Sequence, residues 1–210
     1  MIVTLDGQRV DESFRPGCKL QSVVDQIRGR LSSPNRIIVS VAVNGRRLDD
    51  DVLTETLERP VESDAQVDLE SSEPEELVER AFRGLAESFS QAADGIDHMA
   101  DGLKSSDPTQ AMHDVGDFVT LWQTAYRAIA QCSGLLNRDL TACEFDGQPV
   151  IQCISTLVDR LSELRGALEA RDMVLLADLV RYELQPLARS WQALLVSLAE
   201  QVQAPAARPS

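Results

Sequence analysis

The residues best suited to chemistry in this chain are two histidines and four cysteines. His98 and His113 flank one expected turn between helices and have aspartates close by in the sequence, so they could approach each other. Imidazole and carboxylate groups together can hold a divalent metal. Because these ligands would lie on the surface in no fixed number, we interpret them as solvated polar side chains. A surface metal site involving His98 and His113 stays the alternative.

The cysteines show no CxxC spacing, and three of them fall in segments expected to be helical or to connect helices. We therefore expect reduced thiols, with no zinc site and no disulfide framework. One thiol is expected to be more exposed than the others, because it falls in a polar loop beside Glu144 and Asp146, whose charges disfavour a thiolate. That thiol is Cys143, and the remaining three are Cys18, Cys132 and Cys153.

Motifs for nucleophilic or phosphate chemistry are absent from the sequence. There is no G-x-S-x-G elbow and no phosphate-binding glycine loop. No serine or cysteine is placed with a histidine and a carboxylate in a recognisable pattern. The sequence therefore predicts a protein that is not an enzyme and that carries no cofactor.

The charge of the chain limits its partners. Acidic residues outnumber basic ones by 34 to 20, which gives a net charge of -14, and 43% of the residues are hydrophobic. The negative charge would repel phosphate backbones and anionic lipid headgroups, so neither nucleic acid nor a membrane surface is expected as a partner. The sequence shows neither a leader nor an apolar run long enough to span a bilayer, so we expect a cytoplasmic protein.

The first third of the chain has the pattern of short strands around one helix. Met1, Val3 and Leu5 alternate with Ile2 and Thr4, and Asp6-Gly7 predicts a hairpin turn into QRVDESF. Val39 to Val43 and Val67 to Leu69 alternate in the same way, with a turn at Asn44-Gly45. Between the strands, one helical face is predicted from Leu20, Val23, Val24, Ile27 and Leu31.

The order strand, strand, helix, strand, short strand, loop, strand resembles the β-grasp fold of ubiquitin-like domains. The segments MIVTLDG, NGRRLDDD and ESDAQVDL carry this resemblance. Members of that family serve as tags, sulfur carriers and docking modules, and those activated at the C-terminus end in Gly-Gly. This chain has Glu70 to Pro74 at that point and then continues, so conjugation is not expected. The open sheet face is predicted to be polar, with Ser40, Ala42, Asp68 and Glu70, and Glu12 occupies an expected inward position of the second strand.

The remainder of the chain has apolar residues in alternating steps of four and three, which is typical of helices in a bundle. Ser72-Glu73-Pro74-Glu75 has the form of a capping box and predicts the first helix start. Pro186 predicts a kink near Tyr182. The four stripes are Val78, Phe82, Leu85, Phe89, Ala92, Ile96, Met99 and Leu103; Ala111, Val115, Phe118, Trp122, Ala125, Ile129, Cys132 and Leu136; Val150, Ile154, Leu157, Leu161, Leu164 and Leu168; and Met173, Ala177, Val180, Leu184, Leu187, Trp191, Leu194 and Leu198.

These patterns predict an α+β protein with two domains. Residues 1-70 would form a ubiquitin-like β-grasp domain and residues 71-203 an antiparallel four-helix bundle, followed by a disordered tail at 204-210. The function we predict is a non-enzymatic adaptor that uses both domains as docking surfaces for a protein partner. Alternatives are a chaperone-like binder of secreted or flagellar subunits and, third, a metal-dependent or enzymatic bundle.

Apolar residues outside the stripes mark the candidate partner-binding surface. A shallow groove beside the expected kink would add a tyrosine to leucines of the fourth helix. The same surface could instead form a homodimer through the fourth helix, or only widen the core-facing stripe. The candidate partner-binding residues are Leu175, Leu176, Leu179, Tyr182 and Leu195; Leu121 and Leu135 on the second helix are further apolar residues of this kind.

Overall fold

A computed structural model describes residues 1-15, 17-31, 33 and 35-203. The expected disordered tail at 204-210 lies outside the described residues. The protein is mixed α and β and 65% helical, with a small sheet at the N-terminal end and several helices after it. It consists of two compact units, Met1–Leu77 and a second that begins at Val78.

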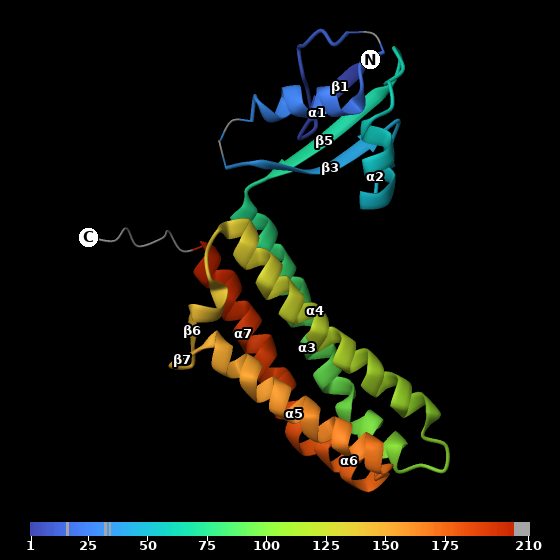
Figure 1. The fold of residues 1–210 in the computed structure, drawn as a ribbon, viewed down its shortest axis with the longest axis vertical. Coiled ribbons are helices and arrows are strands. Elements are labelled where there is room, and N and C mark those ends of the chain that lie inside the picture. The colour runs from blue at the N-terminus through green and yellow to red at the C-terminus, as the bar shows by residue number, and fades with distance from the viewer. Residues whose placement is uncertain (16, 32, 34, 204–210) are drawn as a thin grey trace, which may run out of the picture. The chain divides into compact units, whose positions relative to one another are not determined.

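The first unit is built on a five-stranded sheet with the order β2-β1-β5-β3-β4 (Figure 1). The strands are β1 (Ile2–Leu5), β2 (Gln8–Arg9), β3 (Ile37–Val43), β4 (Arg46–Arg47) and β5 (Gln66–Ser72). β1 and β5 are parallel, and the other neighbours are antiparallel. The two hairpin turns, Asp6-Gly7 and Asn44-Gly45, have positive φ at both residues, as the predicted Asp-Gly and Asn-Gly turns require.

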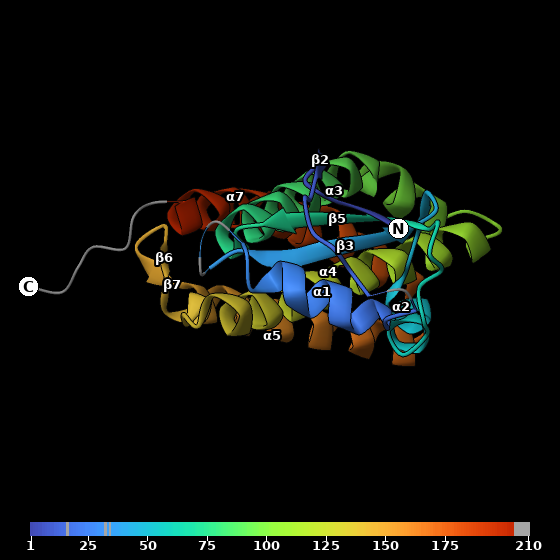
Figure 2. The ribbon, with the colours of Figure 1, turned by 90° about the horizontal axis from the view of Figure 1, so that it is seen from above.

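One face of the sheet packs against helix α1 (Leu20–Arg28), which lies along β3 and β5 in both views (Figure 1, Figure 2). A second short helix, α2 (Asp50–Leu57), follows β4. The predicted helical face is confirmed, except that α1 ends at Arg28 and Leu31 lies beyond it, half-buried. The buried core of this unit is Val3, Leu20, Val23, Val24, Ile27, Val41, Val61, Ala65, Val67 and Leu69.

The other face of the sheet carries polar and small side chains. Ala42 pairs with Asp68 and Ser40 with Glu70, and these four alternate with the buried residues of β3 and β5. The predicted strand at QRVDESF is wrong beyond Arg9, because β2 contains only two residues. Glu12 therefore lies in a loop rather than in a strand. Its side chain is only 5% exposed and forms an ion pair with Arg30.

Long helices form the second unit. They are α3 (Pro74–Leu103), α4 (Thr109–Leu136), α5 (Val150–Ala170) and α7 (Gln185–Gln203), with α6 (Met173–Leu179) and a π-helical turn (Val180–Leu184) before α7. Pro186 has no backbone N–H to donate, and the helical hydrogen-bond pattern changes in the turn just before it, where the kink was predicted. Between α4 and α5 lie a 3₁₀ turn (Leu140–Ala142) and a two-stranded hairpin of β6 (Glu144–Phe145) and β7 (Gln148–Pro149).

The predicted apolar stripes of these helices face one common core. Aromatic rings from three helices meet in it: Phe89 lies 5.8 Å from Trp122 and 5.9 Å from Trp191 between ring centroids. Phe118 packs on Trp122 at 4.3 Å. Buried alanines that were not part of the predicted stripes extend the core-facing side of each helix. Their small side chains let neighbouring helices approach closely. The buried alanines outside the predicted stripes are Ala86, Ala93, Ala100, Ala167, Ala188 and Ala199.

The start of α3 differs in one residue from the predicted capping box. Pro74 is the first helical residue, so Glu73 takes the cap position. The carboxylate of Glu76, rather than Glu75, accepts a hydrogen bond from the backbone N–H of Glu73 at 3.4 Å and from the Ser72 hydroxyl at 3.1 Å. This contact satisfies a backbone donor at the start of the helix that has no partner within it.

The predicted exposure of Cys143 is wrong. The thiol is buried beneath the 3₁₀ turn, and Arg138 Nη2 donates to its Sγ at 3.6 Å. Asp146 and Gly147, read from the sequence as part of a loop, form the turn of the β6–β7 hairpin and both have positive φ. The hairpin folds the chain back, and the N–H of Val150 donates to the carbonyl of Cys143 at 2.9 Å, which closes the backbone loop between these two residues.

Candidate protein-docking surface

Leu175, Leu179, Tyr182 and Pro186 follow one another at intervals of four, three and four residues along α6, the π-helical turn and the first turn of α7. In a regular α-helix this spacing lies on one face, and here the π-helical turn Val180–Leu184 interrupts the regular period between Leu179 and Pro186. We call these four residues the outer stripe. Tyr182 is 66% exposed and Leu175 46%, whereas Leu179 is half-buried against the core and Pro186 is exposed. The outer stripe is an apolar line that solvent can reach.

Ion pairs to α3 and to α5 hold the helical segment that carries the outer stripe. Arg181 donates to carboxylates of α3, at 3.1 Å to Asp97 Oδ1 and 2.6 Å to Asp101 Oδ1. On the opposite side, Glu183 forms an ion pair with Arg160 of α5, with 3.2 Å between Oε2 and Nη2. Tyr182 lies between these two residues in the sequence, and its side chain is 66% exposed.

The charges at this site are mutually stabilised. The Arg181 guanidinium lowers the pKa of Asp101 below its ordinary value, through a hydrogen bond and through charge attraction. The same hydrogen bond from Arg181 to Asp101 raises the pKa of the guanidinium. Lys104, the residue after α3, also pairs with Asp178 of α6 at 2.8 Å, so ion pairs at two levels join α3 and its C-terminal end to this helical segment. These exposed pairs position the outer stripe and contribute little stability individually.

Two of the predicted partner-binding residues are unavailable to a partner. Leu176 and Leu195 are fully buried in the core of the second unit. Leu176 precedes the buried Ala177 and lies one residue after exposed Leu175, so it belongs to the core-facing side of α6. The prediction that these two leucines contact a partner is wrong. Leu175, Leu179 and Tyr182 remain as candidates, and Pro186 is the residue that the sequence reasoning did not include.

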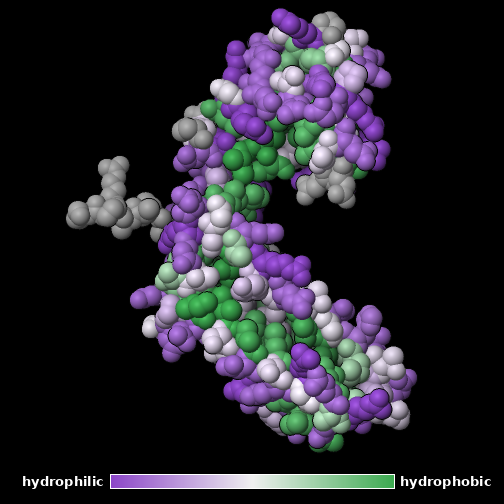
Figure 3. Space-filling model, viewed as in Figure 1, coloured by the Kyte–Doolittle hydropathy of each residue, from purple (hydrophilic) through white to green (hydrophobic). Residues whose placement is uncertain are grey.

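Other exposed apolar side chains are more scattered. Leu135 on α4 is 40% exposed, and Ile151 and Val158 on α5 are 50% and 59% exposed. In Figure 3, apolar residues show along the middle of the second unit, where α4 and α5 face the viewer. Leu121 is half-buried and packs against the core. These residues form no line as continuous as the outer stripe.

The histidines and cysteines of the described residues form no candidate metal centre. In the described ranges, no group of three or more His, Cys, Asp or Glu side chains could hold a metal ion. His98 and His113 are both exposed on their helices. Burial raises the pKa of the Cys132 thiol, and burial together with the charge of Asp146 raises that of Cys153. Neither of these two thiols is an activated nucleophile.

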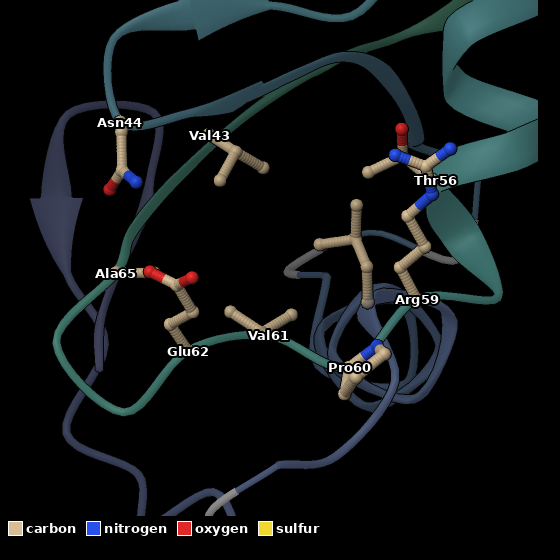
Figure 4. A pocket seen from close by; sticks show the side chains of 9 residues that line it. Val43, Asn44, Thr56, Arg59, Pro60, Val61, Glu62 and Ala65 are labelled. Atoms are coloured by element: carbon tan, nitrogen blue, oxygen red, sulfur yellow. The ribbon is translucent and has the colours of Figure 1, made fainter.

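Two small hollows lie outside the outer stripe. One of about 230 Å³ lies in the first unit, where Val43 and Val61 face each other across the hollow and Arg59 and Glu62 line its other sides (Figure 4). Another of about 200 Å³ lies between the β6–β7 hairpin, α5 and α7, and Cys153 lines it. Sites for drug-sized ligands are about 300 Å³ or more. Both of these hollows are below that volume.

A family model described as "Domain of unknown function (DUF8042)" matches residues 80–194. The match covers the whole outer stripe and most of the four long helices, but none of the first unit. No curated protein and no solved structure matches the chain. Within the described part of the chain, no helix is both long and apolar enough to cross a membrane.

Proposed function

We propose that this chain, which belongs to the family described as "Domain of unknown function (DUF8042)", is a non-enzymatic adaptor that binds other proteins. The observation that carries the proposal is the outer stripe, an exposed apolar line on one helical segment with ion pairs along both sides. Soluble proteins place such lines where another surface covers them. The occupant we propose is an amphipathic helix of another protein.

The charge of the second unit favours a basic partner. Residues 78–203 contain 18 acidic and 10 basic side chains, a net charge of -8. A helix with an apolar face and basic flanks would be attracted to this unit, whereas a second copy of the acidic chain would be repelled. The excess of carboxylates therefore argues for a different protein over a homodimer through the same helix.

The proposal also includes the fold of each unit and the cellular compartment. The strand order β2-β1-β5-β3-β4, with β1 and β5 parallel and one helix across the sheet, supports a ubiquitin-like fold for the first unit. The shared core of α3, α4, α5 and α7 supports a four-helix bundle for the second. The cytoplasm is the compartment that we propose, since the free cysteines among the described residues are compatible with a reducing environment.

Titration with a designed helix tests the docking proposal. The probe is a 21-residue amphipathic peptide with leucine on one face and lysine on the other; a second peptide replaces every lysine by glutamate. We expect the basic peptide to shift backbone amide NMR signals of residues 174–186 in the full-length protein. Leu175→Gln combined with Tyr182→Gln should weaken its binding at least tenfold.

The matched control is Tyr126→Gln, which removes a tyrosine that is 52% exposed on α4, outside the outer stripe. This variant should bind the basic peptide as the wild type does. Equal binding by the double variant would contradict the proposal, as would shifts spread over all acidic surfaces. Light scattering that shows a dimer disrupted by the double variant would assign the outer stripe to a second copy instead.

A further inference from the structure

Strand β3 is paired along its whole length on one side only. Its register with β5 extends from the Ile37–Ser72 pair to the Val43–Val67 pair. On the other side, β4 pairs only with Ala42 and Val43, and the N–H of Leu48 donates to the carbonyl of Val41 at 2.9 Å before the chain turns into α2. No described strand covers the edge of β3 from Ile37 to Ser40. An edge of this kind can pair with an added strand.

A hollow of about 350 Å³ lies beside this open edge. Its apolar wall includes Ile38 from β3, Leu48 after β4 and Leu53 from α2, and all three pack against the core of the first unit. An added strand in line with β4 would run along the rim of this hollow. Every second side chain of that strand would face the hollow, which favours apolar residues at alternate positions.

The polar groups at the hollow are Ser40, Arg47 and Asp49. Arg47 is exposed, and its guanidinium forms no ion pair with any side chain that the structure describes. A carboxylate from an added strand could pair with it bidentately. Arg46 is also exposed but does not line the hollow.

An irregularity in β3 argues against a second copy of this chain as the occupant. The register between β3 and β5 shifts between Ile38 and Ser40, so Val39 is an extra residue in the strand. Such a bulge bends the strand and disrupts regular pairing. Two copies of β3 would bring two bulges to the same interface. Bulges at sheet edges hinder pairing with any added chain, and a regular strand from another protein would meet only this one bulge.

We propose that the open edge of β3 binds an extended segment of another protein by strand addition. The segment carries apolar residues at alternate positions and an acidic residue that pairs with Arg47. Backbone hydrogen bonds to β3 provide the affinity, and the hollow beside Ile38, Leu48 and Leu53 selects the side chains. This surface lies in the first unit and does not depend on the outer stripe.

Hydrogen exchange with synthetic peptides tests the proposal. The probes are blocked octapeptides in which valine or leucine alternates with threonine, with glutamate at both ends, and a matched set ends in lysine. We expect saturating glutamate peptide to slow amide exchange within Ile37–Val41 of the full-length chain at least tenfold. Methylating alternate backbone nitrogens of the peptide removes donors without changing its side chains, and should abolish this protection.

Two exposed arginines provide a matched pair of variants. Arg47→Glu should weaken binding of the glutamate peptides at least fivefold and improve binding of the lysine peptides. Arg46→Glu changes the net charge equally and should leave both affinities within twofold of the wild type. Both residues are exposed on a two-residue strand, so both variants should fold, and the amide spectrum of each checks this.

Three results would overturn the proposal. The first is unchanged exchange of β3 amides with every peptide at millimolar concentration. The second is equal binding by the methylated peptides, which would show that backbone pairing does not contribute. The third is protection of Ile37–Val41 that grows with the concentration of the protein alone, which would assign the edge to a second copy.

Discussion

Leu175 and Leu176 are adjacent in α6 but have opposite environments. Leu175 is 46% exposed, whereas Leu176 is fully buried among the core residues of the second unit. Truncating a buried leucine removes its transfer free energy and leaves a cavity. The pair therefore separates residues that hold the fold together from residues that are free to bind a partner.

We expect Leu176→Ala to lower the free energy of unfolding by about 2–5 kcal/mol. Leu175→Ala should change it by less than about 0.5 kcal/mol, because its side chain is largely in solvent and loses little packing. Urea unfolding of the two variants measures the difference. Equal losses in both would mean that Leu175 contributes to the core and would weaken the docking proposal.

The ion pair between Asp101 and Arg181 makes a pH-dependent contribution to stability. Because Arg181 lowers the pKa of the folded-state carboxyl, the folded protein binds its proton less readily than the unfolded chain does. The stabilisation is therefore present above the ordinary aspartate pKa. It is lost as the pH falls through the lowered folded-state pKa.

Asp101→Asn should consequently be less stable than the wild type at pH 7, and this deficit should disappear in strongly acidic solution. Asp117→Asn is the control, because it removes the same charge from an exposed position of α4 that forms no ion pair with a described residue. Thermal unfolding between pH 2 and pH 7 compares the variants. A deficit for Asp101→Asn that stayed constant over this range would exclude the ion pair as its cause.

At the scale of the elements, α5 ends in a left-handed residue that is not glycine. Arg171 has a φ of 55°, its N–H donates to Leu168 at 3.1 Å, and the N–H of Asp172 donates to Ala167 at 3.0 Å. This is the geometry of a helix C-cap in which glycine is favoured. A side chain at positive φ is strained, and glycine would relieve that strain.

Arg171→Gly should therefore stabilise the protein, by about 0.5–1 kcal/mol after the added entropy of the unfolded chain is included. Ser162→Gly, at an exposed position within α5, should instead destabilise it by about 0.5 kcal/mol. Denaturant unfolding of both variants reports the two signs. A loss of stability on Arg171→Gly would show that the arginine side chain contributes an interaction at this cap.

The sequence predicted some elements better than others for physical reasons. Helical stripes such as Phe82, Phe89 and Trp122 were predicted because burial imposes a period that the sequence repeats over many turns. The β6–β7 hairpin was missed, although Asp146-Gly147 is a strong turn signal, because each strand has only two residues and no alternation.

The candidate site was predicted only in part. An apolar side chain on a helix indicates that some surface covers it. A repeat of apolar residues every seven positions does not tell whether a residue at the edge of the stripe faces the core or the solvent. Leu195 was therefore assigned to a partner, although it packs in the core. The exposure of Cys143 was predicted from its polar neighbours, and tertiary folding of the loop overrode that local composition. The open edge of β3 depends on strand pairing between distant segments, which local patterns do not contain.

At the scale of the whole molecule, the two units have separate cores. The first is centred on α1 and the sheet, and the second on the long helices. Each proposed docking surface lies on one unit alone, so an adaptor of this kind could bind two partners independently. This independence requires that each unit stay folded through its own core. Unfolding experiments on variants of each core can measure whether it does.

Val23 and Leu198 are the matched probes of this separation, since both are fully buried, one in each core. Truncating either removes apolar contacts from its own unit only. In calorimetry of the full-length chain, Val23→Ala should lower the melting temperature of one transition and Leu198→Ala that of another, with effects that add in the double variant. If the protein instead unfolds in one transition that both substitutions lower, the units are energetically coupled. Binding at the edge of β3 would then alter the stability of the outer stripe, because ligand binding stabilises every part of a cooperative unit.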